Sequence, residues 1–180
     1  CCYFDVKSDS NEKISIHSCS FNGCKKGNDD DDTNSIAFST SLYADSITLS
    51  IFNNTFTQCQ QNDFYIVNLK INEYKTGEPF SFVNNSFDNS CGAVQINQPN
   101  GHAIFTNCVF SHLNQKPISL LLNNFIVQDC IFSECGGNVE VVNLVSDANI
   151  ERCIFTNCYY EDNSASVIII SNTNCRFTNN

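Results

Sequence analysis

Residues 125–132 read Phe125-Ile126-Val127-Gln128-Asp129-Cys130-Ile131-Phe132, and variants of this stretch recur along the chain. The most regular part is a Cys or Asn, which we call position zero, followed by Phe two residues later. There are eight copies: Cys2/Phe4, Cys19/Phe21, Asn54/Phe56, Asn85/Phe87, Cys108/Phe110, Cys130/Phe132, Cys153/Phe155 and Cys175/Phe177. From Asn85 onward the copies are 22 or 23 residues apart. A fixed period of this length is typical of a solenoid, in which each repeat is one coil stacked on its neighbours.

The residues before position zero predict a strand that ends in a sharp corner. Positions −5 and −3 are apolar in nearly every copy: Ile14, Leu49, Phe80, Ala103, Phe125, Ala148 and Ile170 at −5, and Ile16, Ile51, Phe82, Phe105, Val127 and Ile150 at −3. Spacing by two indicates one buried face. The alternation then slips by one residue at position −1, which is Ser18, Asn53, Asn84, Asn107, Asp129, Arg152 or Asn174. Asn and Asp tolerate left-handed backbone geometry, so we expect a bend here and a second short strand after it.

A third apolar segment separates the copies and completes the repeat. Examples are Val94-Gln95-Ile96, 118–122, 139–142 and 167–170. Three short strands with corners in roughly 22 residues predict an all-β fold, a parallel β-helix of about eight coils. Two of the intervals between copies are longer, from Cys19 to Asn54 and from Asn54 to Asn85. The additional residues in them are polar and predict loops near 25–34 and 72–79.

Stacking explains why Phe recurs. Adjacent parallel strands lie about 4.8 Å apart, so the same position on successive coils forms a column. Rings at that spacing attract one another, and each buried Phe contributes about 1.5–3 kcal/mol. We therefore expect Phe4, Phe21, Phe56, Phe87, Phe110, Phe132, Phe155 and Phe177 to form a core ladder rather than a ligand-binding strip.

Composition indicates the class of protein. The 180 residues are expected to form a single domain, 1–180, that is a segment of a longer protein. A net charge of −10 argues against binding to nucleic acid or to anionic lipid, and no apolar run is long enough to span a membrane. Twelve Cys and the sequons at Asn53 and Asn84 favour an extracellular or cell-surface protein, although an Asn-rich repeat also produces sequons by chance.

Two stretches resemble a known family. Phe87-Asp88-Asn89-Ser90-Cys91-Gly92-Ala93-Val94 and Phe132-Ser133-Glu134-Cys135-Gly136-Gly137 are similar to the Phe-x-x-Asn and Gly-Gly-Ala-aliphatic signatures of polymorphic-membrane-protein repeats. Those repeats occur in bacterial autotransporter and protist surface proteins. The chain as a whole resembles the right-handed parallel β-helix superfamily that includes the pectate lyases. The resemblance implies a right-handed solenoid.

The cysteines fall on two rows of the repeat. One contains Cys2, Cys19, Cys108, Cys130, Cys153 and Cys175, and the other contains Cys24, Cys59, Cys135 and Cys158, with Cys91 one residue out of register. Neighbours on a row are one strand spacing apart, which a disulfide accepts. We hypothesise that some bonds staple adjacent coils, with Cys108–Cys130 and Cys135–Cys158 preferred and Cys153 and Cys175 as further candidates. The alternative is a ladder of buried thiols.

Candidate reactive groups are sparse, and we predict no cofactor. The run Asp29–Asp32 offers oxygen ligands for calcium, but four adjacent carboxylates in a loop are more often solvated. Zinc is disfavoured because Cys-x-x-Cys pairs are missing. A polysaccharide-cleaving β-helix needs clustered acids, for which Asp129, Glu140 and Glu151 are candidates, although a surface ion pair with Arg152 explains two of them equally well.

These observations predict a non-enzymatic structural or adhesive module of a surface protein, coat or filament. We expect self-association by end-to-end or lateral packing, and a glycan or host-surface molecule is a possible ligand. The alternative is a carbohydrate-binding or polysaccharide-degrading β-helix, with Tyr43, Tyr65, Tyr159 and Tyr160 as candidate sugar contacts.

Overall fold

The computed structural model of the chain describes residues 12–24, 35–43, 47–59, 65–73, 78–97, 101–136, 139–141, 147–158, 168–170 and 175–178. All regular structure in these ranges is β-strand, which confirms the predicted all-β class. The strands form three sheets, and every pairing within them is parallel.

Each sheet takes every third strand of the chain. The first sheet contains β1 (Glu12–His17), β4 (Ile47–Phe52), β7 (Phe80–Val83), β10 (His102–Thr106), β13 (Asn124–Gln128), β16 (Asp147–Glu151) and β19 (Cys175–Thr178). The second contains β2 (Ser20–Asn22), β5 (Thr55–Thr57), β8 (Ser86–Ser90), β11 (Val109–Leu113), β14 (Ile131–Ser133) and β17 (Ile154–Thr156). The third contains β3 (Ser35–Tyr43), β6 (Tyr65–Glu73), β9 (Gly92–Asn97), β12 (Ile118–Leu121), β15 (Val139–Val141) and β18 (Ile168–Ile170).

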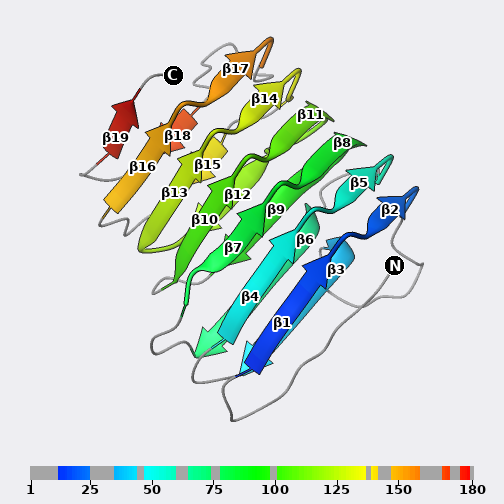
Figure 1. Ribbon diagram of the computed structural model, residues 1–180, viewed down its shortest axis with the longest axis vertical. Helices are drawn as coiled ribbons and strands as arrows, with labels where there is room; N and C mark the ends of the chain where they lie inside the picture. Colours follow the sequence, from blue (N-terminus) through cyan, green and yellow to red (C-terminus); the bar gives the residue numbers. More distant parts are fainter. Residues whose placement is uncertain are drawn as a thin grey trace.

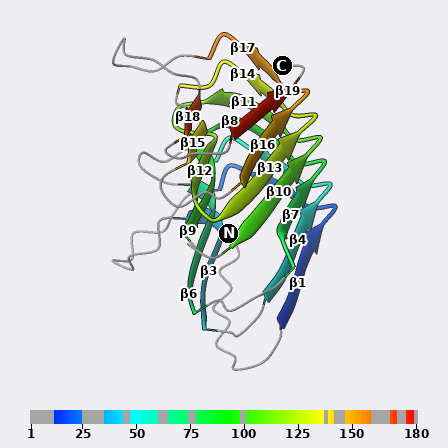
Figure 2. The same cartoon turned by 90° about the vertical axis from the view of Figure 1, so that its left-hand side faces the viewer.

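The chain therefore passes through the three sheets in turn and then returns to the first, one strand further along. Figure 1 shows the first-sheet strands side by side, and those from β1 to β16 each continue around a bend into a second-sheet strand. In Figure 2 the third-sheet strands lie across the body from the first sheet. We call one first-, second- and third-sheet strand in sequence a turn. The third apolar segment of the repeat, predicted from 94–96, 118–122, 139–142 and 167–170, is confirmed as β9, β12, β15 and β18.

The first sheet is in register at the apolar positions of the repeat. Ala103 pairs with Phe80 on one side and with Phe125 on the other, which confirms the column at position −5. Phe105 pairs in the same way with Phe82 and Val127 at position −3. All six side chains are buried, because alternation by two points both columns into the core.

The corner between the first and second sheets lies where the sequence predicts it. The residue at position −1 has a positive φ in all six described copies: Ser18, Asn53, Asn84, Asn107, Asp129 and Arg152, with φ between 52° and 55°. A second corner follows the second sheet at position +4 and was not predicted. It contains Gly23, Gln58, Asn89, His112, Glu134 and Asn157, with φ between 45° and 63°.

The phenylalanine column is confirmed for six of its eight predicted members. Successive rings of Phe21, Phe56, Phe87, Phe110, Phe132 and Phe155 lie 4.7–5.3 Å apart between centroids, with interplanar angles of 3–6°. The rings are stacked because register pairing places each directly over the next. Phe4 lies outside the described residues.

The eighth copy was assigned to the wrong frame. Cys175 pairs with Ala148 and Phe177 pairs with Ile150, so both belong to the first sheet rather than to the corner and the second sheet. Ile170, which the sequence placed at position −5, instead ends β18 in the third sheet opposite Val141. Phe177 is therefore at position −3 of its strand and is not a member of the phenylalanine column.

The described strands give six turns of three strands and the first strand of a seventh. The copy at Cys2 lies outside the described residues, so the estimate of about eight coils stays a prediction. The loop predicted at 72–79 starts later, because β6 continues to Glu73 as a nine-residue strand paired with β3. The loop predicted at 25–34 lies outside the described residues.

Within one strand, the inward and outward side chains should differ sharply in energetic importance. In β14, Phe132 is 1% exposed and Ile131 is 40% exposed. We expect Phe132→Ala to lower the free energy of unfolding by about 3–5 kcal/mol, because it opens a cavity inside the ring column. Ile131→Ala should cost about 1 kcal/mol or less. Urea denaturation followed by circular dichroism measures both, and equal losses would contradict the column as the main packing element.

A β-branched residue at the first corner should lower the stability of the fold. Asn107 has a φ of 53° and an exposed side chain, so a substitution there acts mainly through the backbone. We expect Asn107→Val to be less stable than Asn107→Gly by about 1–2 kcal/mol, because only glycine enters the left-handed region without a steric cost. Chemical denaturation of the two variants provides the comparison, and equal stability would argue against this corner.

Candidate functional site

Two columns of small polar side chains line the corners of the fold. The first-corner column is the set at position zero: Cys19, Asn54, Asn85, Cys108, Cys130 and Cys153. Its backbone is joined from turn to turn, since the residue after position zero donates its N–H to the position-zero carbonyl of the preceding turn. The bonds run from Thr55, Ser86, Val109, Ile131 and Ile154 to Cys19, Asn54, Asn85, Cys108 and Cys130, at 2.9–3.0 Å.

Asn and Cys perform the same task in this column. Asn85 Nδ2 donates to the carbonyl of Ile51 at 2.7 Å, which is position −3 of the preceding turn. The thiol of Cys108 donates to the carbonyl at the same position, that of Phe82, at 3.4 Å. Asn54 and Cys153 make the corresponding bonds at 2.9 and 3.5 Å. A buried carbonyl needs a donor, so either side chain fits where an apolar one would leave it unsatisfied.

The amides also bond each other along the stack. Asn85 Oδ1 accepts from the backbone N–H and from Nδ2 of Asn54, both at 3.1 Å. Asn54 Oδ1 in turn accepts from the backbone N–H of Cys19 at 2.9 Å. Asn54 and Asn85 are each 1% exposed, and these bonds account for their burial. The column is a structural element of the core.

The second-corner column lies at position +5 and contains Cys24, Cys59, Ser90, Leu113, Cys135 and Cys158. In the third turn, position +5 is occupied by Ser90 and not by Cys91. The Oγ of Ser90 accepts a hydrogen bond from the backbone N–H of Cys59 at 3.1 Å. Cys91 is therefore outside the column, as its spacing predicted. Gly136 follows Cys135 where a Cβ would lie 3.0 Å from the carbonyl oxygen of Asn114, so this turn needs glycine.

The nine cysteines whose side chains the structure describes are all thiols. The candidate bonds Cys108–Cys130 and Cys135–Cys158 are therefore not formed, although the members of each pair occupy adjacent turns of one column. Cys153 follows Cys130 in the same column, whereas Cys175 does not, because it lies in β19 opposite Ala148. The thiol ladder, the alternative drawn from the sequence, is the state that the structure contains.

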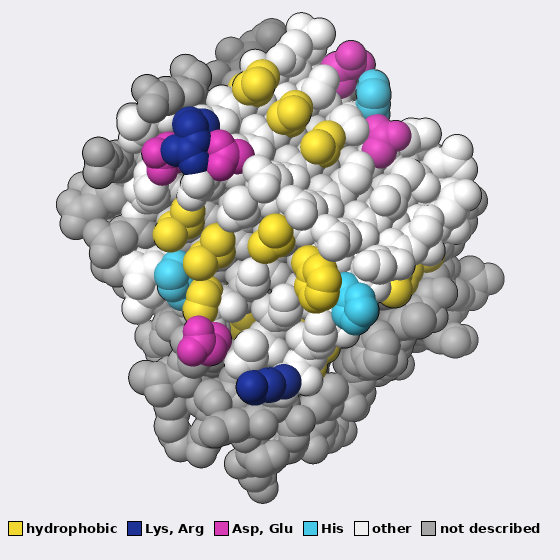
Figure 3. Space-filling view, in the orientation of Figure 1, with side chains coloured by type: hydrophobic (Ala, Val, Ile, Leu, Met, Phe, Trp, Pro, Cys, Tyr) yellow, Lys and Arg dark blue, Asp and Glu magenta, His cyan; other side chains and the backbone are white. Residues whose placement is uncertain are grey.

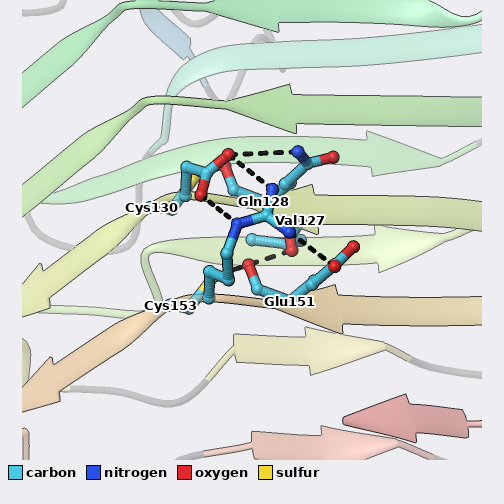
Figure 4. Close-up of polar contacts among 7 residues, drawn as sticks. Val127, Gln128, Cys130, Glu151 and Cys153 are labelled. Carbon is cyan, nitrogen blue, oxygen red and sulfur yellow. Dashed lines mark hydrogen bonds and ion pairs between the residues drawn. The ribbon is translucent and has the colours of Figure 1, made fainter. Parts of the chain in front are cut away.

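An ion-pair network covers the first corner between β13 and β16 (Figure 4). The guanidinium of Arg152 donates from Nε and Nη2 to the two carboxylate oxygens of Asp129, at 2.6 and 2.9 Å, and from Nη1 to Glu151. The hydrogen bond from Arg152 holds the pKa of Asp129 below its usual value. The network ties two adjacent turns together.

Of the acids proposed for catalysis, Asp129 and Glu151 both bond Arg152 at the first corner, whereas Glu140 lies in a different sheet, in β15 of the third. Tyr43 and Tyr65 lie at opposite ends of the paired strands β3 and β6, and Tyr159 and Tyr160 lie outside the described residues, as does Asp29–Asp32. Within the described ranges, no three His, Cys, Asp or Glu side chains are grouped so that they could hold a metal ion.

A second charged cluster, which the sequence did not reveal, lies at the second corner. His112 Nδ1 bonds Asp88 Oδ1 at 2.8 Å, and His112 Nε2 lies 3.5 Å from Glu134 Oε2. Ser111 Oγ donates to the same Asp88 oxygen at 2.6 Å. The hydrogen bond to Asp88 raises the pKa of His112, and those from Ser111 and His112 lower the pKa of Asp88. No sequence motif predicts this cluster because its members come from three successive turns.

The outer face of the first two sheets is mostly uncharged. Figure 3 shows rows of apolar side chains among polar ones, with charges confined to a few places. Ile131 and Ile154 are adjacent in register and are 40% and 57% exposed. The sequon residues Asn53 and Asn84 are exposed at the first corner on adjacent turns, and Asn84 Nδ2 donates to Asn53 Oδ1 at 3.1 Å.

Comparison of the chain with protein-family models, with curated proteins and with solved structures finds no match. The resemblance to polymorphic-membrane-protein repeats therefore continues to depend on the two quoted stretches alone. None of the described residues forms a helix of the length and apolarity that crossing a membrane requires.

The pairing at the second corner predicts different titrations for two histidines. His112 should titrate above 6.5, whereas burial lowers the pKa of His102 below that value. Because the folded pKa of His112 is raised, its pairing stabilises the fold below pH 6.5, and this stabilisation is lost as pH rises through the folded pKa. Asp88→Asn should bring His112 back toward 6.5 and leave His102 unchanged. NMR titration of the imidazole protons measures both, and an unshifted His112 would contradict the pair.

Proposed function

We propose that the chain is a structural module, a right-handed parallel β-helix that forms a rod within an extracellular or cell-surface protein, coat or filament. This proposal is supported by the three parallel sheets, the stacked phenylalanine column and the two hydrogen-bonded corner columns. In each of these, the recurring residues join one turn to the next. The exposed sequon residues Asn53 and Asn84 support the location.

The observation that carries the proposal is the state of the two ends of the stack. Among the described strands, β1, β2 and β3 pair on one side only, as do β17, β18 and β19 at the other end. The phenylalanine column is half-buried at both ends, at Phe21 and Phe155, whereas its four inner rings are buried. Unpaired strand edges beside open apolar columns are surfaces onto which a further turn can add.

The further turn comes either from the same polypeptide or from a second copy of the chain. In both cases the added strand pairs with the exposed edge, and an apolar side chain covers the last ring of the column. Each added turn extends the rod by about one strand spacing of 4.8 Å without changing the geometry of the turns below. A net charge of −10 opposes lateral association of identical rods, so we favour contact through the ends.

A matched pair of substitutions in β17 distinguishes end-to-end from lateral packing. Phe155 points into the column at the end of the stack, and its neighbour Ile154 points outward. We expect the isolated chain to form concentration-dependent oligomers, with Phe155→Lys weakening assembly at least tenfold and Ile154→Lys leaving it nearly unchanged. Sedimentation velocity measures the oligomers, and circular dichroism checks that both variants fold.

Three outcomes of this experiment would contradict the proposal or part of it. If the chain remains monomeric at high concentration, self-assembly through the ends is ruled out. Loss of assembly on Ile154→Lys alone would assign the contact to the outer face of the second sheet. Equal effects of the two substitutions would show that the open column has no special role.

A further inference from the structure

The second-corner column ends in two thiols of different accessibility. Cys135 follows β14 and Cys158 follows β17, and the register pairs Ser133 with Thr156, two residues before each cysteine. The two side chains therefore lie on adjacent turns, about one strand spacing apart. Cys135 is 0% exposed, whereas Cys158 is half-buried at the end of the column.

The two sulfurs are held differently. Cys135 Sγ donates to the carbonyl of Phe110 in the preceding turn at 3.5 Å and lies 3.6 Å from the carbonyl of Ser133. Cys158 Sγ donates to the carbonyl of Thr156 in its own turn at 3.6 Å. The inner thiol is therefore anchored in the core, and the outer thiol lies at the end of the stack.

We propose that Cys158 and Cys135 form a thiol–disulfide exchange site, with Cys158 as the attacking thiol and Cys135 as the resolving thiol, for small disulfides such as oxidised glutathione. The spacing of the two cysteines lies within the range that a disulfide accepts. This inference does not require end-to-end assembly, but a turn that adds onto β17 would cover Cys158, so the site is accessible only where that end of the stack is free.

The hydrogen bond between the two sulfurs favours Cys158 as the attacking thiol. This bond lowers the pKa of the Cys158 thiol to about 6 and raises the pKa of the Cys135 thiol well above its usual value. The outer sulfur is therefore largely the thiolate at neutral pH, and the inner sulfur keeps its proton until Cys158 has reacted. Low pKa together with partial exposure is typical of a reactive cysteine.

The exchange proceeds in two balanced steps. The Cys158 thiolate attacks one sulfur of the small disulfide, forms a mixed disulfide with it and releases one glutathione thiolate. Cys135 then loses its proton to solvent and attacks the Cys158 sulfur, which forms the Cys135–Cys158 bond and releases the second glutathione thiolate. Two protein thiols are oxidised and one glutathione disulfide is reduced to two thiols.

Cys24 and Cys59, at the other described end of the same column, also combine a half-buried thiol with a buried partner. The remaining cysteines lack one of the two requirements. Cys130 and Cys153 are also neighbours in a column, and the pKa of Cys153 is lowered to about 7, but both side chains are buried. Cys19 is exposed, but the next side chain in its column is the amide of Asn54, which cannot resolve a mixed disulfide. The pair at Cys135 and Cys158 combines access with a resolving partner.

The test exposes the reduced chain to oxidised glutathione at pH 6, stops the reaction with acid, alkylates the remaining thiols and maps the peptides by mass spectrometry. We expect a glutathione adduct at Cys158 that gives way to a Cys135–Cys158 disulfide, while an adduct at Cys19 persists. A thiol of pKa about 6 is half ionised at this pH. Allowing for its lower intrinsic nucleophilicity, Cys158 should react on the order of tenfold faster in the folded than in the unfolded chain.

Two substitutions separate the roles. Cys135→Ala should trap the glutathione adduct at Cys158, whereas Cys59→Ala, which removes the other buried cysteine of the same column, should leave the exchange unchanged. If circular dichroism shows that Cys135→Ala does not fold, Cys158→Ser serves instead and should abolish both the adduct and the bond while the Cys19 adduct remains. A persistent adduct at Cys158 in the unsubstituted chain would overturn the proposal, as would a rate no faster than in the unfolded chain.

Discussion

In-register pairing of parallel strands is the constraint on which the rest of the structure depends. Because each turn lies over the previous one without offset, every side chain must tolerate the residue at the same position above and below it. Phenylalanine meets this condition by stacking, with rings 4.7–5.3 Å apart. Charged residues meet it by alternating in sign, as Asp129 and Arg152 do at adjacent turns of the first corner.

The same constraint explains why this chain is rich in both asparagine and cysteine. A column at a corner needs a small side chain that donates a hydrogen bond to the carbonyl of the turn below, and an amide and a thiol both satisfy it. Cys59, Cys108, Cys135 and Cys153 make this hydrogen bond. Cys24 and Cys158, at the two described ends of the second-corner column, differ from the inner members by being only half-buried.

The repeat predicted the three-strand turn, the first corner and the ring column, because each of them recurs as one residue type at one position. The second corner was missed, since Gln58, His112 and Glu134 have no preference for left-handed geometry and adopt it because the strands on both sides are held in register. The last copy was misassigned because Cys-x-Phe alone does not fix a register; its polar Asn172 at position −3 was the available warning. The cluster around His112 and the unequal thiols depend on contacts between turns, which a linear pattern does not contain.

The third sheet narrows along the stack, and this taper has a mechanical consequence. Its strands β3 and β6 are nine residues long, whereas β9 has six residues and β12 has four. In a solenoid, the stability of the stack is approximately a sum of contacts between neighbouring turns, so the turns around β3 and β6 are joined by more backbone hydrogen bonds in this sheet than the turns around β12. Heating or pulling should therefore separate the turns around β12 before the turns around β3 and β6.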